Sequence, residues 1–381
     1  MPDLQSYDQP DSKPADLPVD PASRLRSLDA LRGFDMFWIA GGDVLATKIL
    51  SRFTSPTAVS LKDQFEHVEW EGFRFYDLIF PLFLFLVGCV IPFSLEKFRE
   101  RPARAYARIL KRTALLFLLG VICNGLLKFD FANLRYAGVL QRIALCYGIA
   151  AVLFLNLKLR GQVVAIVSIL LGYWAVLALV SVPGGSAGDF TQAGNLCGYI
   201  DRNYLPGKIM DEYYGFGDNE GLLSTIPAIA TVLLGALAGQ WLKSARTGWT
   251  KSAGLLVSGI LCVAVGILWG LKFPIIKNLW TSSFVLLAGG WSLLLLCLFY
   301  TLIDVLRWQK WSFVWTVIGM NAITIFIVPR FIDFSKMATF FLSGLAELSG
   351  DWSSVVLVAG SLLAKWLFLY YLYRNKIFLR L

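Results

Sequence analysis

His67 is the only histidine in the chain, and it stands in the sequence EHVEWEG. Histidine is the side chain whose ordinary pKa lets it gain and lose a proton near neutral pH. A single surface histidine usually has no catalytic role, but here Trp70, Gly72 and Asp77 follow and lead into an apolar stretch. We expect a loop held against the start of a helix, whose dipole favours a carboxylate in its first turn. His67 is therefore the leading candidate for acid–base chemistry.

Four ionisable residues stand in a second, otherwise apolar sequence, SLDALRGFDMFWIAGGDVLA: Asp29, Arg32, Asp35 and Asp43. Such groups are costly inside a membrane and usually face a cavity or a partner. On a continuous helix, Arg32 and Asp43 differ by about 20° of rotation and lie about 16 Å apart along the axis. The sequence therefore predicts a polar face that runs from Arg32 to Asp43 and ends at the level of His67. The structural alternative is a set of intramembrane ion pairs, such as Asp29 with Arg32.

The sequence RYAGVLQRIALCYG places Gln141 and Arg142 about one turn inside another apolar stretch. Arg142 is a candidate counter-charge for Asp43 or Asp77. A purely structural salt bridge is the alternative explanation for this arginine.

The segment 183–220 lies between two apolar stretches and is rich in aromatic residues and glycine. That composition favours an ordered structure over a linker, and we predict a lid or a pocket wall. Some of its charged residues are candidates for contact with a polar substrate, although solvated side chains explain them equally well. They are Asp201, Arg202, Asp218 and Glu220.

Apolar stretches recur along the chain, which has 57% hydrophobic and only 16% charged residues. Soluble domains usually have about 25% charged residues, and about 20 apolar residues cross the ~30 Å hydrocarbon core of a membrane as a helix. The predicted fold class is all-α, a polytopic transmembrane helix bundle of about ten spans. A short interfacial helix is predicted at 335–347. The predicted spans are 31–50, 74–95, 106–127, 138–157, 163–182, 221–242, 252–271, 279–303, 312–331 and 353–373.

Lys and Arg accumulate on the cytoplasmic side of membrane proteins, and the densest basic run is residues 97–112. A short loop with that charge is hard to translocate, so both termini are expected in the cytoplasm. Residues 1–23, rich in Pro, Asp and Ser, are predicted to be a disordered cytoplasmic tail. The net charge of +9 fits this topology and contact with anionic membrane lipids, and it needs no nucleic acid. A phosphate-bearing ligand bound by residues 97–112 is the competing explanation.

The six cysteines give no disulfide framework and no metal-binding spacing such as CxxC. Cys197 stands alone in the segment 183–220, and the others lie in predicted spans. We therefore expect small packing residues and no metal site. The cysteines in predicted spans are Cys89, Cys123, Cys146, Cys262 and Cys297.

Seven sequence blocks, in this order, resemble the heparan-α-glucosaminide N-acetyltransferase family. They are SLDALRG, the spacing of His67, Trp70, Gly72, Asp77 and the following FP, then AGVLQR, GYIDR, EGLLSTIPAIATVLLG, KNLWTSSFVL and GMNAI. The chain is similar in particular to the bacterial NagX-like branch, which is associated with amino-sugar use. The resemblance implies that residues 24–381 form one transmembrane acyltransferase domain in a bacterial inner membrane.

The resemblance also implies the reaction: transfer of an acetyl group from acetyl-CoA on the cytoplasmic side to an amino sugar or related glycan on the periplasmic side. The family's catalytic histidine falls on His67, and Asp43 stands where the lysosomal members have an assisting asparagine. Asp43 is able to orient or deprotonate His67, whereas an amide only forms hydrogen bonds. The positions expected to bind the acceptor or the acyl-CoA are Asp29, Arg32, Trp70, Asp77, Gln141, Arg142, Asn278, Ser282 and Asn321.

Two mechanisms stay open at this point. His67 either deprotonates the acceptor for direct attack on the thioester or carries the acetyl group itself. A transporter of amino sugars or oligosaccharides is the alternative function, because charges inside a helix bundle fit that class as well. Small-residue faces of membrane helices are also compatible with a homodimer. The candidate donors for the oxyanion are Asn278, Ser282, Ser283 and Asn321.

Overall fold

The computed structural model describes residues 25–210 and 215–379, so the predicted tail of residues 1–23 lies outside the described residues. The described chain folds into helices, with two isolated β-bridges and no longer strand among these residues. Each of the predicted spans contains a helix or a broken helix. The helices are α1 Arg26–Phe37, α2 Asp43–Leu50, α3 Pro56–Asp63, α4 Ile79–Leu95, α5 Pro102–Cys123, α6 Val139–Asn156, α7 Leu159–Leu179, α8 Leu196–Tyr204, α9 Thr225–Lys243, α10 Gly248–Gly270, α11 Ser282–Tyr300, α12 Phe313–Met320, α13 Ala322–Ile327, α14 Phe334–Leu348 and α15 Ser353–Arg374.

Seven helices of the described chain are long and apolar enough to cross a membrane, or eight if the bent pair α12 and α13 is one span. That number is smaller than the ten spans predicted from the sequence. The bent pair turns by 74°, and α5 carries Arg104, Arg108, Lys111 and Arg112 in its first three turns. The long apolar helices are Phe75–Phe98, Val139–Asn156, Leu159–Leu179, Thr225–Lys243, Gly248–Gly270, Ser282–Val305 and Gly350–Arg374.

The predicted span 31–50 is not one straight helix. Gly41 has φ 118° and ψ 13° inside a short π-helix, Trp38–Gly42, that separates α1 from α2. This conformation is open to glycine but strained for other residues. The prediction that Arg32 and Asp43 share one face of a continuous helix is therefore wrong. Lys365 Nζ donates to the Ala40 carbonyl at the bend (2.7 Å), which satisfies a backbone group near the interruption.

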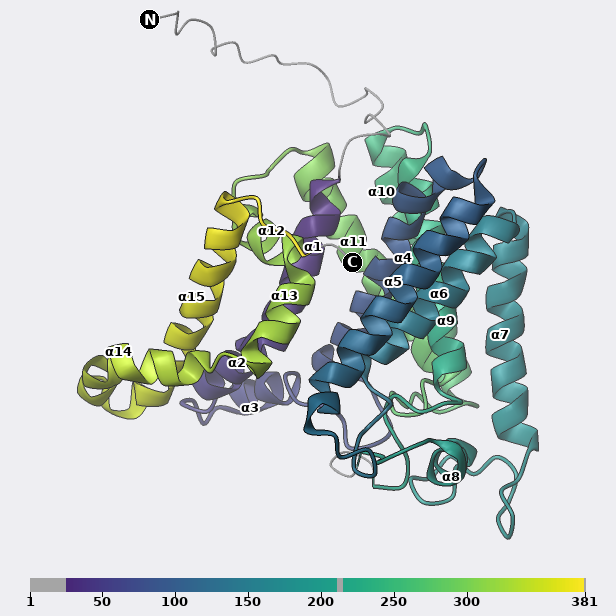
Figure 1. The fold of residues 1–381 in the computed structure, drawn as a ribbon, viewed down its shortest axis with the longest axis horizontal. Helices are drawn as coiled ribbons and strands as arrows, with labels where there is room; N and C mark the ends of the chain where they lie inside the picture. The colour runs from purple at the N-terminus through teal and green to yellow at the C-terminus, as the bar shows by residue number, and fades with distance from the viewer. Residues whose placement is uncertain (1–24, 211–214, 380–381) are drawn as a thin grey trace, which may run out of the picture.

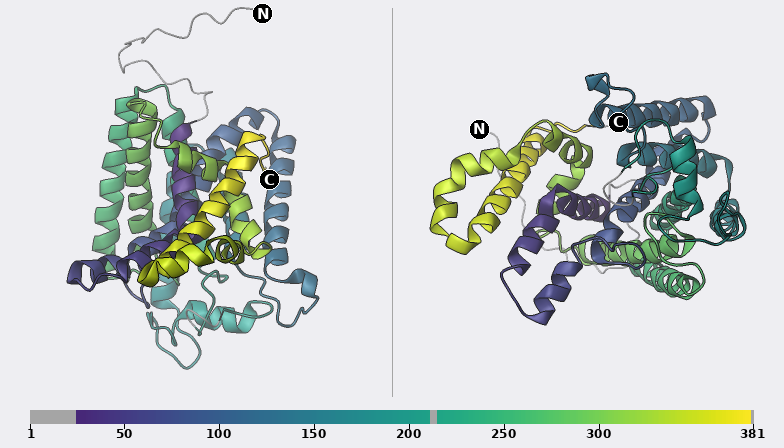
Figure 2. Two further views of the ribbon diagram at one scale, coloured as in Figure 1. Left: turned by 90° about the vertical axis from the view of Figure 1, so that its left-hand side faces the viewer. Right: turned by 90° about the horizontal axis from the view of Figure 1, so that it is seen from below.

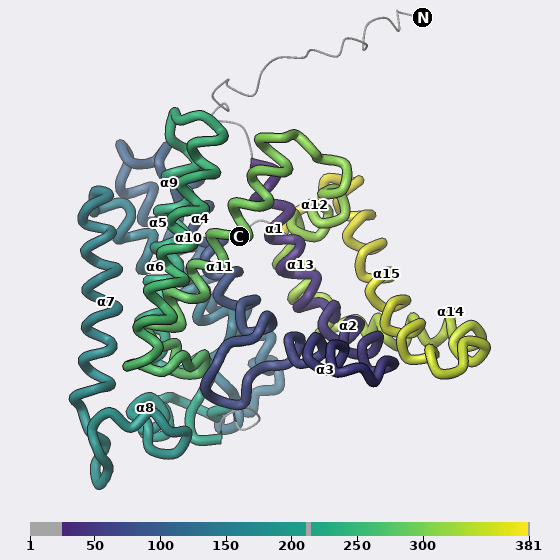
Figure 3. The backbone as a smooth tube through the Cα atoms, turned by 180° about the vertical axis from the view of Figure 1, so that it is seen from behind, coloured from purple at the N-terminus to yellow at the C-terminus, as the bar shows by residue number. Residues whose placement is uncertain are grey.

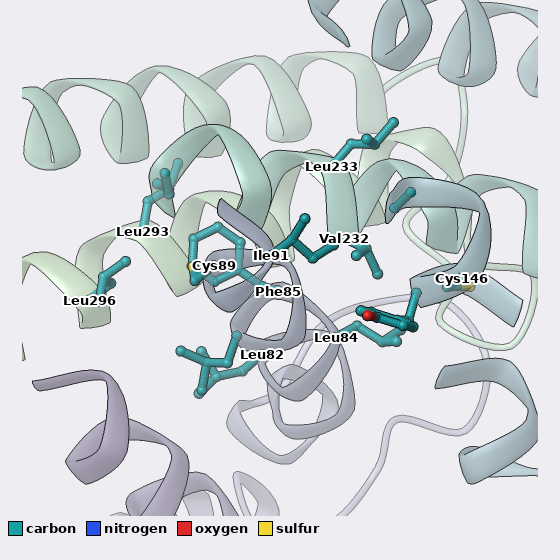
Figure 4. Close-up of a cluster of buried hydrophobic side chains, with 14 of the residues drawn as sticks. Leu82, Leu84, Phe85, Cys89, Ile91, Cys146, Val232, Leu233, Leu293 and Leu296 are labelled. Carbon is teal, nitrogen blue, oxygen red and sulfur yellow. The ribbon is translucent and has the colours of Figure 1, made fainter. Parts of the chain in front are cut away.

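Helix α4 forms the centre of the bundle and packs against α9, α6, α1 and α11. Its apolar side chains meet those of α9 and α11 in the main core, shown in Figure 4. Glycines let α4 and α9 approach closely: a Cβ on Gly88 would lie 2.0 Å from the Val232 carbonyl oxygen, and one on Gly235 would lie 1.9 Å from that of Phe85. Small residues at such crossings favour close packing of membrane helices.

The bundle has two distinct ends (Figure 1). The segments 51–74, 124–138, 180–210, 215–224, 271–281 and 328–352 gather at one end, which we call the His67 end, together with α3, α8 and α14. The short connections after α4, α6, α9 and α11 lie at the opposite end, which we call the basic end. The basic residues of those connections are Lys97, Arg99, Arg101, Lys158, Arg246, Arg307 and Lys310.

Helices at the edges of the bundle are less enclosed. Figures 1 and 3, seen from opposite sides, place α7 at one edge and α14 with α15 at the other. From below, α2 and α3 form a hairpin beside the bundle (Figure 2). A helix predicted at 335–347 is confirmed as α14, which starts where the Asp333 carboxylate accepts hydrogen bonds from the Ser335 and Lys336 backbone N–H groups.

Candidate active site

The loop that carries His67 is ordered by its own backbone and by one carboxylate. Ser55 caps the N-terminus of α3 by accepting a hydrogen bond from Ala58 N, and Tyr76 N donates to the Gln64 carbonyl after the helix ends (2.9 Å). The Asp77 carboxylate accepts hydrogen bonds from Arg74 N (3.1 Å) and from Val68 N (3.3 Å). A charged acceptor that joins two backbone donors fixes the loop more firmly than neutral hydrogen bonds do.

His67 lies between a carboxylate and an ammonium group. Its Nδ1 is 2.7 Å from Oδ1 of Asp77, whose side chain is completely buried. Nζ of Lys277 lies 3.0 Å from Nε2 and 2.7 Å from Nδ1 of the same ring, and 3.4 Å from Oδ1 of Asp77. The ring of Tyr76 covers the imidazole at a centroid distance of 4.7 Å. The arrangement holds the ring in one orientation.

The protonation of His67 follows from these neighbours. Burial lowers the pKa of His67 from its ordinary 6.5; the hydrogen bond with Asp77 opposes this effect, and the charge of Lys277 adds to it. The ring is therefore neutral near pH 7. A buried carboxylate beside Nδ1 favours the tautomer whose Nδ1–H donates to Asp77 and whose Nε2 has the free electron pair. A ring in that state is able to accept a proton at Nε2.

A cavity of about 320 Å³ opens beside this group. His67, Lys277 and Asn278 line it. The segment 183–220, predicted to form a pocket wall, contributes Met210, Asn219 and Glu220. The other lining residues are Ile39, Tyr76, Ile79, Phe80, Arg135, Val139, Trp280, Phe326 and Arg330.

A second cavity, of about 280 Å³, lies between α1, α4, α5, α6 and the bend between α12 and α13. Arg32, Arg108 and Arg112 line it near the basic end, and most of its remaining wall is apolar. The two cavities share four wall residues from four elements. These shared residues are Ile39, Phe80, Val139 and Phe326.

Asp77, and not Asp43, is the carboxylate that bonds to the His67 ring. Asp77 was expected to bind substrate, but its buried carboxylate lies behind His67 and orients it. Asp43 was expected to orient His67. It starts α2 just beyond the bend at Gly41, half-buried, and its charge raises the pKa of His67 as the smallest of several effects.

Three predicted binding residues have structural neighbours instead of a place in either cavity wall. The Trp70 indole donates to the Phe190 carbonyl (2.8 Å) and packs in a small core beside α7 and α8. Ser282 is fully buried and donates to the Leu170 carbonyl (2.7 Å). Asn321 stands at the break between α12 and α13, between two residues that line the second cavity.

Arg142 is not the counter-charge of Asp43 or Asp77. Its buried guanidinium donates to Ser224 Oγ and lies over the Trp280 ring, 5.0 Å from the centroid. Gln141 is buried beside Gly120 and Gly138 at the start of α6. Arg142 therefore supports the packing of α6 against Ser224 and Trp280, and Gln141 supports the packing of α6 against α5.

Asp29 and Arg32 form the ion pair that was the structural alternative, with NH1 of Arg32 3.7 Å from Oδ1 of Asp29. Arg32 nevertheless also lines the second cavity. The pair thus leaves the guanidinium where a ligand in that cavity would meet it.

A charged cluster holds segment 183–220 over the site. Arg135 Nε donates to Asp218 (2.8 Å), and the same guanidinium also binds Glu220. Asp201 in α8 accepts hydrogen bonds from Asp218 N (3.2 Å) and Leu222 N (3.0 Å). Burial raises the pKa of Asp201 to about 6, although these two hydrogen bonds oppose the shift. Asp201 and Asp218 are thus buried and not solvated.

The sequence reasoning missed Lys277 and Arg135 as residues of the site. Lys277 begins the block KNLWTSSFVL, and Arg135 stands two positions before AGVLQR, so each lay in or near a recognised block. Arg108 and Arg112 belong to the basic run 97–112, where a phosphate-bearing ligand was the competing explanation. All six cysteines are free. Within the described ranges, no group of three or more His, Cys, Asp or Glu residues is placed to hold a metal ion.

Comparison with known proteins identifies relatives of the chain. No protein-family model matches the chain. The chain is 29% identical over 325 residues to the heparan-alpha-glucosaminide N-acetyltransferase of Homo sapiens, and equally to that of Mus musculus; each match covers 69% of this chain and 48% of the relative. The chain thus spans about half the length of these curated relatives. The matches confirm the resemblance of the ordered sequence blocks: the chain is related to the heparan-α-glucosaminide N-acetyltransferases.

Proposed function

We propose that this protein is a transmembrane acetyltransferase. It takes the acetyl group of acetyl-CoA from the basic end, which faces the cytoplasm of a bacterium, and transfers it to an amino sugar or related glycan at the His67 end. The proposal rests on one observation above all. The cavity lined by Arg32, Arg108 and Arg112 shares wall residues with the cavity lined by His67.

The chemistry of the second cavity suits a coenzyme A thioester. Guanidinium groups pair with phosphate oxygens through directed, charge-assisted hydrogen bonds. The apolar remainder of the wall suits the uncharged pantetheine arm. Arg32 and Ile39 are seven positions apart, or roughly 10 Å along a helix. An arm that enters beside Arg32 therefore leads its thioester toward the junction of the two cavities.

The His67 end suits the acceptor. An amine attacks a thioester only when its nitrogen has a free electron pair, so a base must remove a proton as the carbon–nitrogen bond forms. In the proposed step the acceptor amine attacks the thioester carbonyl carbon, its proton passes to Nε2 of His67, and the carbon–sulfur bond breaks. The proton then reaches the departing sulfur, which leaves as the CoA thiol. Asn278 in the cavity wall is the candidate donor to the oxyanion.

His67 as an acyl carrier is the second version of this mechanism. Nε2 would attack the thioester carbonyl carbon first, the carbon–sulfur bond would break, and CoA would leave as the thiolate; the acceptor amine would then take the acetyl group from Nε2, and its proton would go to the thiolate. Both versions require the same neutral ring. They differ in whether CoA thiol is released before an acceptor is present.

The test uses purified protein, labelled acetyl-CoA and glucosamine as the acceptor probe. The His67→Ala variant should lose transfer by at least 10²–10⁴-fold, on the order expected for a general base, while it still binds acetyl-CoA. Glu69→Gln, an exposed residue of the same loop, is the matched control and should transfer at the normal rate. Transfer by the His67 variant at the wild-type rate would overturn the proposal. Labelled protein formed without glucosamine would support the acyl-carrier version.

A further inference from the structure

Lys277 lies against His67 although the two residues are far apart in the sequence. Its Nζ is 3.0 Å from Nε2 and 2.7 Å from Nδ1 of the ring, and its side chain is 16% exposed. It lines the same cavity as His67. The ammonium group therefore contacts both ring nitrogens, and it does so in the cavity from which an acceptor amine would approach Nε2.

The backbone that carries Lys277 is held on both sides. Gly72 N donates to the Ile275 carbonyl (2.9 Å), which joins this segment to the His67 loop. Ile276 N donates to the buried Thr281 hydroxyl (3.1 Å). Because the backbone is fixed, the ammonium leaves the ring by rotation of the lysine side chain alone.

The hydrogen atoms fit one arrangement of this group. An ammonium group has three N–H donors and no acceptor, and a neutral imidazole has one donor and one acceptor. When Nδ1–H donates to Asp77, Nε2 is the acceptor that remains for Lys277. A second proton on the ring would then face the Lys277 ammonium at about 3 Å, which Coulomb repulsion disfavours.

We infer that Lys277 is a positioning residue of the proposed active site: its ammonium group occupies Nε2 of His67 in the resting protein, keeps the ring neutral, and gives way to the acceptor amine. The part that concerns the acceptor rests on the proposed function, whereas the contact with the ring does not. Lys277 acts through His67, since a neutral ring is the form that removes the acceptor's proton. Loss of the ammonium charge should let His67 take up a proton at higher pH.

Several other charged groups surround the imidazole, and a Lys277 variant keeps all of them. Burial lowers the pKa of His67, and the carboxylates of Asp77 and Asp43 oppose this effect. The charge of Glu220 acts on Lys277. Arg135 and Arg330 line the cavity, and the Arg74 guanidinium donates to the His67 carbonyl.

Because His67 is the only histidine, its protonation can be followed directly. Protein labelled with ¹⁵N-histidine, carrying a purification tag free of histidine, gives one imidazole signal in nuclear magnetic resonance spectra. In the wild type the ring should titrate below pH 6.5. In Lys277→Met the midpoint should rise by about one pH unit or more. Lys277→Arg keeps the charge and should remain closer to the wild type.

Lys272→Met is the matched control, because Lys272 is exposed on the same segment and should leave the titration unchanged. Lys277→Gln is a second neutral variant in case the methionine variant does not fold. An unchanged midpoint in either folded neutral variant would overturn the inference. If the midpoint of the His67 titration rises in the neutral variants but the wild-type protein never acetylates glucosamine, the proposed function is contradicted and the inference about the Lys277 contact stands. If the midpoint rises and the acidic limb of the pH profile for acetyl transfer shifts by the same amount, the result supports both the proposed function and the inference about Lys277.

Discussion

Asp77 is the residue on which the orientation of His67 depends. Its carboxylate accepts a hydrogen bond from Nδ1 of the ring and from two backbone N–H groups of the loop, Val68 and Arg74. One buried side chain therefore sets both the tautomer of the base and the path of the chain around it. An assisting carboxylate was expected from the sequence, but at Asp43.

The Asp77→Asn substitution should separate these two effects. The amide keeps the size of the side chain and loses the charge, so Nδ1–H loses its preferred partner and the free electron pair no longer has to lie on Nε2. In the proposed mechanism kcat for acetyl transfer should fall by about 10³–10⁴-fold. The KM for acetyl-CoA should change little, because Asp77 lies outside the second cavity. Steady-state kinetics with glucosamine measure both constants.

The thermal stability of the Asp77→Asn variant shows whether a lower kcat results from unfolding. Loss of charge-assisted hydrogen bonds to two backbone donors should cost about 1–3 kcal/mol, which leaves most of the protein folded. Glu71→Gln changes an exposed carboxylate in the same loop and should alter neither rate nor stability. A folded Asp77 variant that keeps the wild-type kcat would show that the ring does not need this partner.

Helix α5 brings two arginines of the basic run 97–112 into the wall of the second cavity. In the proposed function these arginines bind the phosphates of acetyl-CoA. Arg108→Ala or Arg112→Ala should raise the KM for acetyl-CoA by about tenfold or more, since a hydrogen bond to a charged group contributes about 1.5–3 kcal/mol. The value of kcat at saturation should change much less. Lys111→Ala, exposed between them, is the matched control. Equal KM values in all three variants would remove the phosphate-binding part of the proposal.

The helices were the most predictable part of the fold, because twenty apolar residues leave a chain in lipid few alternatives. Each predicted span contains helix in the structure, and α14 also appears where a short helix was expected. The interruptions were not predicted. Gly41 and Asn321 break their spans through backbone geometry and packing, which an apolar run does not encode.

Residues of the candidate site were predictable from the sequence only where the residue type or a recognised sequence block indicated a role. His67 was identified because it is the single histidine, and Asn278 because it lies in a block of the family. The contact between His67 and Lys277 joins residues 210 positions apart. No periodicity or spacing signals such a contact, since it arises from the fold that brings the segment 271–281 against the His67 loop.

The two ends of the molecule differ, because its two cavities share wall residues inside the bundle and lie toward opposite ends. Basic residues gather at the end where the arginine-lined cavity lies. His67, α8 and the segment 183–220 lie at the other end (Figure 1). In the proposed topology the first end faces the cytoplasm and the second the periplasm. In the proposed function, the enzyme would take its two substrates from opposite sides of the membrane.

Sealed vesicles test this direction and separate the enzyme from a carrier. With the basic end facing the medium, labelled acetyl-CoA outside and glucosamine enclosed, acetylated sugar should form in the lumen while CoA thiol appears outside. Vesicles of the opposite orientation should need acetyl-CoA inside, because the impermeant nucleotide has to enter beside the arginines. His67→Ala vesicles are the control for leakage and should form no product in either orientation. Product formed equally from both sides would contradict the two-ended site, and glucosamine uptake without acetyl-CoA would favour a transporter in its place.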